Sequence, residues 1–164
     1  MDMKALVIYD SIFGNTEQIA KAIGGAIGSS EEANVLRVNA VHPDQLQGLE
    51  LLIVGSPTRG FKPTPEITDF LKNIADNSLQ GVKAAAFDTR LGNDDIGSPL
   101  VRFFVKIGGY AAKPIGATLE KKGASLVLHP EGFFVKGSGG PLKEGELERA
   151  AAWAREIVET SNSQ

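Results

Sequence analysis

Short apolar runs recur along the chain, and segments with helical or turn-like patterns separate them. The runs cover residues 5–9, 35–38, 50–55, 82–87 and 125–128. Each is nearly continuously apolar instead of alternating with polar positions, which is typical of strands buried on both faces. The pattern therefore predicts a parallel sheet that is covered by helices on both sides.

The segment after the first run has the periodicity of an amphipathic helix. Ile19, Ile23 and Ile27 repeat at the spacing of one turn, so they share one face. Asn15 with Gln18 has the form of an N-cap with its reciprocal partner. We therefore expect a helix that is capped at Asn15 and packs its isoleucines on the sheet.

The third run leads into the clearest helix of the sequence. Thr64 is a suitable N-cap, and Pro65 suits the first helical position because its missing N–H group is not needed there. The apolar residues that follow form a stripe at i, i+3, i+4 and i+7, namely Ile67, Phe70, Leu71 and Ile74.

The region from 98 to 123 predicts a bent or two-part helix. Gly108 and Gly109 interrupt its helical pattern, which resumes after Pro114. The apolar stripe of the first part consists of Leu100, Phe103, Phe104 and Ile107.

The C-terminal part predicts one more strand and one more helix. Residues 128–135 resemble a strand that is interrupted at 130–132, either by a bulge or by a hairpin turn. The loop 136–146 is predicted to lie on the surface, and a polar tail is expected from Thr160. The expected apolar face of the terminal helix consists of Leu147, Ala150, Ala151, Ala154 and Val158.

The alternation of strands and helices predicts an α/β fold: a three-layer αβα sandwich with a doubly wound, five-stranded parallel sheet. We expect one domain over residues 1–160 and a polar C-terminal tail over 161–164. Right-handed crossovers place the loops after successive strands along one edge of the sheet. A ligand is expected at that edge.

Composition narrows the possible functions. The 164-residue chain is 42% hydrophobic, so it can bury a substantial core, and its formal charge of -3 includes no basic block of the kind that tracks nucleic acid. The chain has no cysteine and only two histidines, which excludes disulfides and thiolate sites and argues against a metal cluster. No apolar run approaches the ~20 residues of a membrane span, and we expect a soluble protein of the reducing cytoplasm.

The first loop has the composition of a phosphate site. Residues 11–16 connect a buried strand to a helix N-terminus, where unpaired N–H groups and the helix dipole favour an anion. Gly14 permits an unusual backbone angle, and Ser11, Asn15 and Thr16 can donate further hydrogen bonds. The alternative is an ordinary capped helix, because the same residue types are common in turns and caps.

Other phosphate-binding loops fit less well. The first strand is not followed by the Gly-x-Gly-x-x-Gly pattern of dinucleotide sites. Residues 55–62 nearly match a P-loop, but Lys62 comes one position late and Pro63 replaces the residue that would hold magnesium. A phosphorylated receiver domain would need paired acids after the first strand, where Asp10 stands alone.

The stretch Tyr-Asp-Ser-Ile-Phe-Gly-Asn-Thr, residues 9–16, resembles the phosphate loop of flavodoxins, and the order of elements is similar over nearly the whole chain. The resemblance implies a flavodoxin-like fold with strand order 2-1-3-4-5 and FMN as the cofactor. It implies that the phosphate is held by residues 11–16, which are Ser11, Ile12, Phe13, Gly14, Asn15 and Thr16. Ile12 and Phe13 depart from the family pattern, in which hydroxyl-bearing residues are frequent.

By the same resemblance, two further loops should enclose the isoalloxazine ring. The loop after the third strand should contribute Pro57, Thr58, Arg59, Gly60 and Phe61, and that after the fourth Asp88, Thr89, Arg90 and Gly92. Flavodoxins commonly carry an aromatic residue on each side, whereas here Arg59 occupies the first position and the second loop has none. Because a guanidinium stabilises added negative charge, we expect easier two-electron reduction than with two aromatic walls.

The function implied by the resemblance is that of a redox protein that carries electrons between protein partners, with no catalytic side chain. Gly60 retains a family feature, since the peptide after it can turn its carbonyl towards flavin N5. Two alternatives remain: an FMN-dependent reductase that transfers electrons from NAD(P)H to a quinone, and a flavin-free binding domain. Pro57-Thr58-Arg59 also resembles the loop of flavodoxin-like quinone reductases, but this chain lacks their inserted segments.

Overall fold

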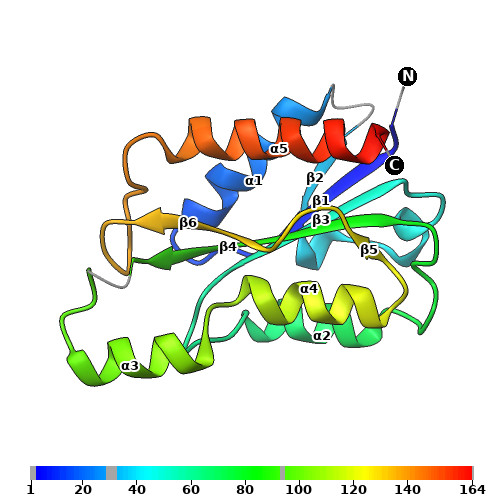
Figure 1. Ribbon diagram of the computed structural model, residues 1–164. Helices are drawn as coiled ribbons and strands as arrows, with labels where there is room; N and C mark the ends of the chain where they lie inside the picture. The colour runs from blue at the N-terminus through cyan, green and yellow to red at the C-terminus, as the bar shows by residue number, and fades with distance from the viewer. Residues whose placement is uncertain (1–2, 29–32, 93–94, 164) are drawn as a thin grey trace.

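The computed structural model describes residues 3–28, 33–92 and 95–163 and is built around a parallel sheet (Figure 1). The strand order is β2-β1-β3-β4-β5, and β6 also pairs with β4. All recorded strand pairs are parallel, which confirms the predicted fold class and strand order. The strands are β1 (Ala5–Tyr9), β2 (Ala33–Arg37), β3 (Leu51–Pro57), β4 (Lys83–Leu91), β5 (Ser125–Leu126) and β6 (Glu131–Val135).

The fifth position in the sheet is filled by two pieces, β5 and β6, along the same side of β4. Ala84 of β4 pairs with Leu126 of β5, and Phe87 of β4 pairs with Glu131 of β6. Between these two pairs the chain advances by three residues in β4 but by five residues from β5 to β6. The two extra residues form a bulge between the pieces. A bulge was one of the two expectations; the hairpin is wrong, because both pieces run parallel to β4. The interruption lies at 127–130, slightly earlier than predicted.

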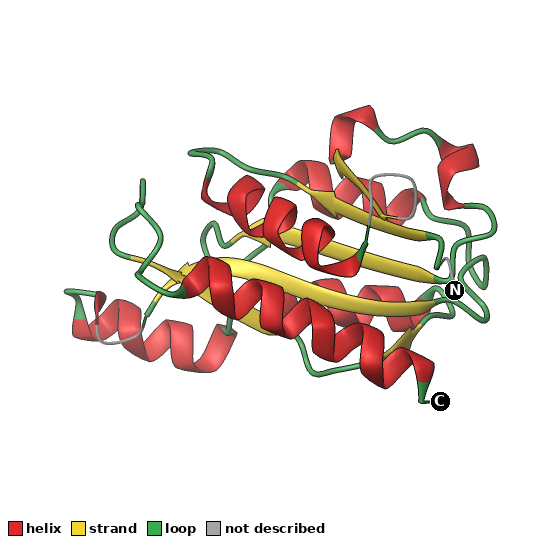
Figure 2. Ribbon diagram, turned by 90° about the horizontal axis from the view of Figure 1, so that it is seen from above, coloured by secondary structure: helices red, strands yellow, loops and turns green. Residues whose placement is uncertain are grey.

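Helices cover both faces of the sheet. The first helix, α1 (Asn15–Ile27), and the last, α5 (Glu146–Asn162), lie side by side on one face, and α2 (Pro65–Asn73) and α4 (Ala112–Lys121) lie on the other (Figures 1 and 2). Two short 3-10 helices, Val38–Ala40 and Pro43–Leu46, follow β2. Over the described ranges, no helix combines the length and apolarity needed to cross a bilayer.

The apolar strands supply two separate cores because their side chains alternate between the faces. Val7 and Ile53 join the layer beneath α1 and α5, while Ile8 and Val54 join that beneath α2 and α4. In the first core the rings of Phe87, Phe133 and Trp153 meet edge to face, with centroids 5.8 to 6.2 Å apart. Burial on both sides explains why the runs lack alternation.

Two helix starts test the predicted caps. The Thr64 hydroxyl accepts a hydrogen bond from the Ile67 N–H at 3.4 Å with Pro65 in the first helical position, as predicted. The cap predicted at Asn15 is wrong, because Gly14 occupies the N-cap position in a left-handed conformation with φ of 94°. Asn15 is the first helical residue and is buried instead.

The predicted two-part helix is confirmed as α3 (Pro99–Gly108) and α4. Helix α3 projects beyond the end of the sheet at which β4 and β6 finish (Figure 1). Leu100 and Phe103 of the predicted stripe are 64% and 57% exposed, so these two residues do not join the core. The side chains of Phe104 and Ile107 lie outside the described residues.

Helix α5 is rotated relative to the predicted apolar face. Its buried residues include Ala150 and Ala154 as expected, but Trp153 and Ile157 complete the face, and Leu147 is exposed. The larger side chains therefore determine the orientation. The polar segment from Thr160, which the sequence predicts to lie beyond the helix, is still helical up to Asn162.

Candidate functional site

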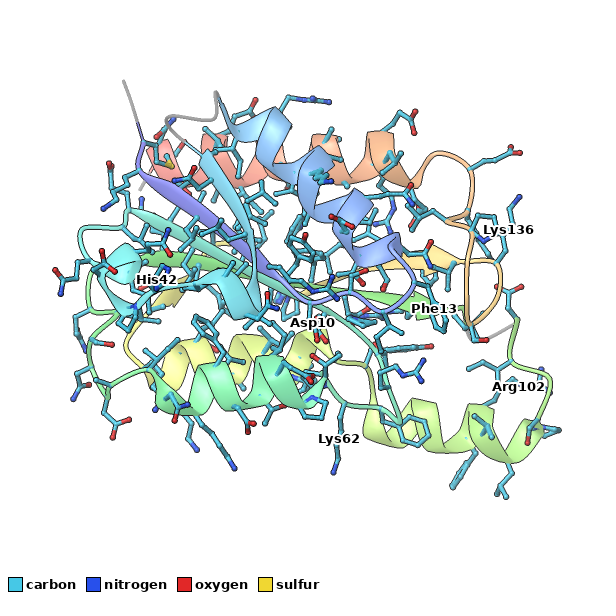
Figure 3. The ribbon with its side chains drawn as sticks, turned by 180° about the vertical axis from the view of Figure 1, so that it is seen from behind. Asp10, Phe13, His42, Lys62, Arg102 and Lys136 are labelled. Atoms are coloured by element: carbon cyan, nitrogen blue, oxygen red, sulfur yellow. The ribbon has the colours of Figure 1, made fainter. Side chains whose placement is uncertain are left out.

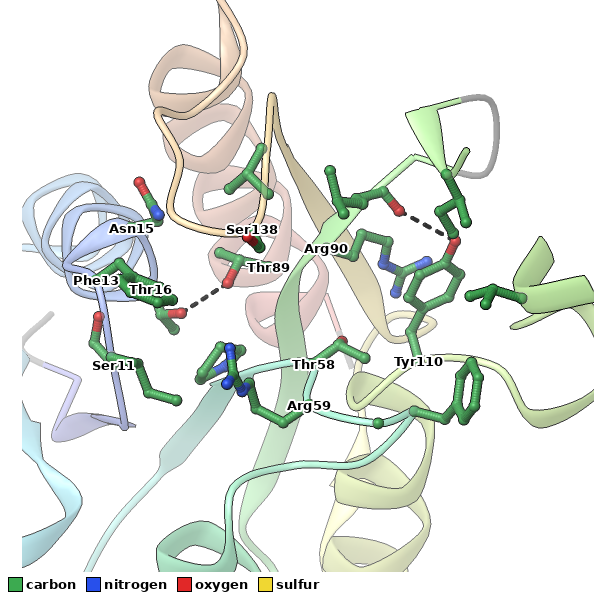
Figure 4. A pocket seen from close by; sticks show the side chains of 18 residues that line it. Ser11, Phe13, Asn15, Thr16, Thr58, Arg59, Thr89, Arg90, Tyr110 and Ser138 are labelled. Carbon is green, nitrogen blue, oxygen red and sulfur yellow. Dashed lines mark hydrogen bonds between the residues drawn. The ribbon is translucent and has the colours of Figure 1, made fainter. Parts of the chain in front are cut away.

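A cleft of about 290 Å³ opens at the edge of the sheet where β1, β3, β4 and β6 end. It is enclosed by the turn before α1, the loop after β3, the end of β4 and the α3–α4 junction (Figure 4). Twelve predicted site residues line it: Ser11, Ile12, Phe13, Asn15, Thr16, Pro57, Thr58, Arg59, Gly60, Phe61, Thr89 and Arg90. Gly14, Asp88 and Gly92 do not, and the cleft also includes Leu91, Ile96, Val101, Tyr110, Val135 and Ser138.

The turn before α1 is organised by Ser11. Its buried hydroxyl accepts hydrogen bonds from the N–H groups of Gly14, at 3.0 Å, and Glu17, at 3.4 Å. The Ser11 N–H donates to the Asp10 carboxylate at 2.9 Å. The Ser11 side chain therefore holds the turn in shape, and the capacity to bind an anion resides mainly in the neighbouring backbone.

That backbone has spare donors. Among the described residues, no acceptor is recorded for the N–H groups of Ile12, Phe13, Asn15 and Thr16. All four residues line the cleft, and the last two begin α1. Unpaired N–H groups at a helix N-terminus attract an anion, because the helix dipole adds to their own partial charges.

A cation supports this turn from behind. Arg37, at the end of β2, donates to the Ser11 carbonyl and to the Asp10 carboxylate, the latter at 3.3 Å. The loop itself contains no cation, and no local pattern points to Arg37, because β2 is adjacent to β1 only in the folded sheet. The turn thus combines backbone dipoles with one nearby guanidinium.

The loop after β3 forms a tight turn at the lower side of the cleft in Figure 4. Arg59 and Lys62 exchange backbone hydrogen bonds of 2.8 and 3.0 Å, and the two residues between them have positive φ angles. Gly60 adopts 54° without strain, whereas Phe61 adopts 70°, a conformation that an aromatic residue rarely takes. The Arg59 guanidinium lies 5.9 Å from the centre of the Phe13 ring.

This loop is fixed to the rest of the cleft through Thr58. Its N–H donates to the Thr89 carbonyl at 3.0 Å, and its hydroxyl accepts from the Ala111 N–H at 3.2 Å. Thr89 in turn exchanges a hydrogen bond of 2.8 Å with the Thr16 hydroxyl. The turn before α1, the loop after β3, the end of β4 and the α3–α4 junction are therefore joined by hydrogen bonds.

The end of β4 carries a buried ion pair. Asp88 receives two hydrogen bonds from Arg90, from Nε at 2.6 Å and Nη2 at 2.7 Å, and a third from the Ala112 N–H at 2.8 Å. Burial raises the pKa of Asp88, and the Arg90 guanidinium opposes that rise. Asp88 was expected to face the ligand; it lies behind the cleft because these three donors occupy it.

Arg90 also contacts an aromatic residue that the sequence analysis missed. Its guanidinium carbon lies 3.8 Å from the centre of the Tyr110 ring, and the Tyr110 hydroxyl donates to the Leu91 carbonyl at 3.3 Å (Figure 4). Burial raises the pKa of Tyr110, so its hydroxyl keeps the proton that it donates. Tyr110 follows the Gly108–Gly109 break and lies in the short connection between α3 and α4, which borders the cleft.

The loop 136–145 reaches the cleft as well, although the sequence predicts only a surface loop. Ser138 lines the cleft, and Gly140 approaches the Asn15 amide so closely that a Cβ there would lie 2.6 Å from Oδ1. Glycine at 140 thus allows this loop to approach the start of α1.

Two polar residues near the ends of β4 and β5 do not line the cleft. The Asp95 carboxylate pairs with Lys143 at 2.5 Å and approaches the buried Gly92. His129 is exposed in the connection between β5 and β6.

The sequence and the fold are similar to those of known proteins. A family model described as flavodoxin matches residues 7–153. "Probable flavodoxin 1" of Bacillus subtilis (strain 168) is 28% identical over 130 residues, which cover 78% of this chain and 80% of that protein. A solved flavodoxin from the domain Archaea superposes with a TM-score of 0.75 at 26% identity, covering 98% of this chain and 99% of that one. Oxidised Flavodoxin 1 from Bacillus cereus has the same fold, with a TM-score of 0.72 at 23% identity over 94% of this chain and 97% of that one.

Proposed function

The chain belongs to the flavodoxin family of FMN-binding electron carriers, and from this premise we propose which of its residues hold the cofactor and exchange the electrons. When bound, FMN supplies the redox chemistry, while the protein supplies binding, orientation and electrostatics. No side chain of the cleft needs to form or break a covalent bond.

In this proposal, the backbone N–H groups of residues 12, 13, 15 and 16 bind the FMN phosphate. The observation that carries this assignment is that these four groups line the cleft without an acceptor among the described residues. The Thr16 hydroxyl and the Asn15 amide lie at the same turn and supply further donors. Arg37 adds positive charge behind it without entering the cleft of about 290 Å³. These N–H, hydroxyl and amide donors fit the dianionic phosphate of FMN, because each can donate a hydrogen bond to a charged oxygen.

The isoalloxazine ring is proposed to lie in the remainder of the cleft. The turn 57–61 lines one side, and Thr89, Arg90 and Tyr110 line another. These walls have little polar surface apart from two guanidiniums, so they suit a planar aromatic system that gains negative charge on reduction. Gly60 already has a positive φ of 54°, which leaves the peptide that follows free to reorient towards the ring.

The mouth of the cleft is apolar. Ile12 and Phe13 of the turn are 50% and 57% exposed, and Leu100 and Phe103 are exposed on α3. The turn with Phe13 and helix α3 lie at the same end of the molecule (Figure 3). An exposed apolar rim next to a redox cofactor allows a partner protein to approach and exclude water. We propose that redox partners dock here.

The absence of cysteine fits a reducing compartment such as the cytoplasm.

A reductive titration tests the proposal. The protein is expected to be isolated with FMN bound, and potentiometry is expected to resolve two one-electron steps, as a carrier of single electrons requires. A colourless protein that takes up no added FMN would overturn the proposed site. A single two-electron step with rapid NAD(P)H-dependent quinone turnover would instead assign the chain to the reductases.

A further inference from the structure

The two arginines that line the cleft are held very differently. Arg59 is exposed, and its guanidinium has Phe13 as a distant neighbour at 5.9 Å. The Arg90 side chain is only 19% exposed and is fixed by both oxygens of Asp88, at 2.6 and 2.7 Å. A bidentate pair of this kind leaves the guanidinium little freedom, so Arg90 has a defined position relative to the cleft.

Two further contacts restrict Arg90. The Tyr110 ring lies against the guanidinium at 3.8 Å. Gly132 of β6 packs directly on it, and a Cβ at that position would overlap Nε and Cζ. Tyr110 is itself tied to Leu91, and the Arg149 guanidinium donates to the Gly132 carbonyl. The surroundings of Arg90 are therefore as rigid as the ion pair.

The Asp88–Arg90 ion pair has a defined orientation relative to the cleft. Arg90 lines the cleft, whereas the fully buried Asp88 does not. The positive end of the pair therefore faces the cleft, and the negative end points into the protein. Because water is excluded around Asp88, each charge acts over the short distance to the cleft with little screening.

We propose that Asp88, which does not contact the ligand space, sets the redox potential of the bound flavin by partly neutralising Arg90. Reduction adds negative charge to the ring, which the Arg90 guanidinium stabilises, and the Asp88 carboxylate limits this effect. Asp88 is thus a positioning and tuning residue that acts through Arg90. This inference rests on the proposed function, because it requires FMN in the cleft.

The test measures the midpoint potential of the two-electron couple in FMN-loaded variants by spectroelectrochemistry. Asp88→Asn keeps the shape of the side chain but removes the charge that opposes Arg90. The affinity for reduced FMN relative to oxidised FMN should therefore rise about tenfold, which raises the midpoint potential by about 30 mV. Arg90→Gln should change the ratio in the opposite direction. A pair that is merely structural would not give shifts of opposite sign. Asp69→Asn, on the exposed surface of α2, removes the same charge and should leave the potential unchanged.

A second comparison covers the case in which Asp88→Asn does not fold, since it leaves a buried arginine unpaired. The double variant Asp88→Asn with Arg90→Gln replaces both charges with amides that can bond to each other. In Arg90→Gln the buried Asp88 carboxyl has lost its counter-ion and should take up a proton, so it no longer carries a charge. If Asp88 acts through Arg90, the double variant should therefore have the same potential as Arg90→Gln. A difference between these two, or an Arg90→Gln potential equal to that of the wild type, would overturn the inference.

The outcomes separate this inference from the proposed function. FMN binding by each apoprotein is measured first, by quenching of flavin fluorescence. A wild-type chain that binds no FMN would overturn the proposed function and the inference with it. A chain that binds FMN, with potentials that do not respond to Asp88, overturns the inference alone.

Discussion

The Thr16 hydroxyl at the start of α1 lies 2.8 Å from the Thr89 hydroxyl near the end of β4, although 73 residues separate the two positions. Both side chains are buried and both line the cleft. This hydrogen bond joins the turn proposed to hold the phosphate to the strand proposed to hold the ring. The two ends of the cofactor site are thereby fixed relative to one another.

Replacement of Thr16 by valine should weaken FMN binding about tenfold or more. The substitution preserves shape but removes both the contact with Thr89 and a donor to the phosphate, and a hydrogen bond to a charged group contributes about 1.5–3 kcal/mol. Thr89→Val loses only the first contact and should have a smaller effect. Fluorescence titration of the apoproteins measures both affinities. Thr118→Val on α4, which loses a hydroxyl bonded to Pro114 at 2.9 Å, is the matched control. Wild-type affinity in Thr16→Val would refute the role given to this hydroxyl.

Substitution of Gly14 should act through backbone strain and not through steric overlap. Its φ is 94°, yet no atom beyond the two neighbouring residues lies within 4 Å of the position that a Cβ would take. A β-branched residue avoids this left-handed region, at a cost of about 1–2 kcal/mol, while asparagine tolerates it better. Gly14→Val should therefore bind FMN more weakly and melt at a lower temperature than Gly14→Asn. Equal behaviour of the two variants in both measurements would contradict this explanation.

Removal of the Arg37 charge should weaken phosphate binding and change its response to salt. Arg37 contacts Asp10 and the Ser11 carbonyl behind the turn, so Arg37→Met removes one positive charge near the proposed anion. We expect a several-fold loss of FMN affinity and a smaller decrease of affinity with added salt than in the wild type. Arg155→Met, on the exposed surface of α5, serves as the control. An unchanged salt dependence would show that Arg37 only supports the turn.

The stability of the protein should fall in acid through Glu146, which anchors β6 to α5. Burial raises the pKa of Glu146, but hydrogen bonds from Arg149, at 2.7 Å, and from the Phe134 N–H, at 2.7 Å, outweigh it and hold the pKa below its ordinary value. A carboxyl whose pKa is lowered by folding contributes stability above its unfolded pKa of about 4.3, and this contribution is lost as the pH falls through the folded value.

Glu146→Gln should therefore be less stable than the wild type at neutral pH, by about 1 kcal/mol, and the difference should shrink below about pH 4.3. Urea unfolding at several pH values measures it. Glu156→Gln, at an exposed position of α5, should show no such pH dependence. A difference between Glu146→Gln and the wild type that is constant with pH would contradict the assignment.

The sequence predicts the sheet well because the strands depend on local signals. Continuous apolar runs indicate strands buried on two faces, and Gly14-Asn15-Thr16 at a strand–helix junction indicates an anion site. Thr64 and Pro65 likewise predict the start of α2, because the preferences for a helix cap and for the first helical position are local. The orientation of α5 is less predictable, because alanines define its apolar face weakly and Trp153 overrides them.

The remaining parts of the cleft depend on tertiary contacts that no local pattern reveals. Tyr110 reaches Arg90 only because the connection between α3 and α4 packs against the end of β4, and Arg37 reaches Ser11 only because β2 pairs with β1. From the sequence alone, Asp88 is expected to contact the ligand. In the structure its carboxylate instead pairs with Arg90, which lies two residues later on the same strand.

The central claim is that backbone N–H groups at the start of α1 bind a phosphate, and the direct test compares FMN with riboflavin, which lacks it. Titration calorimetry of the apoprotein with each ligand isolates the contribution of this group. Several charge-assisted hydrogen bonds of about 1.5–3 kcal/mol each should make FMN bind at least a hundredfold more tightly than riboflavin. Equal affinities for the two ligands would contradict the account.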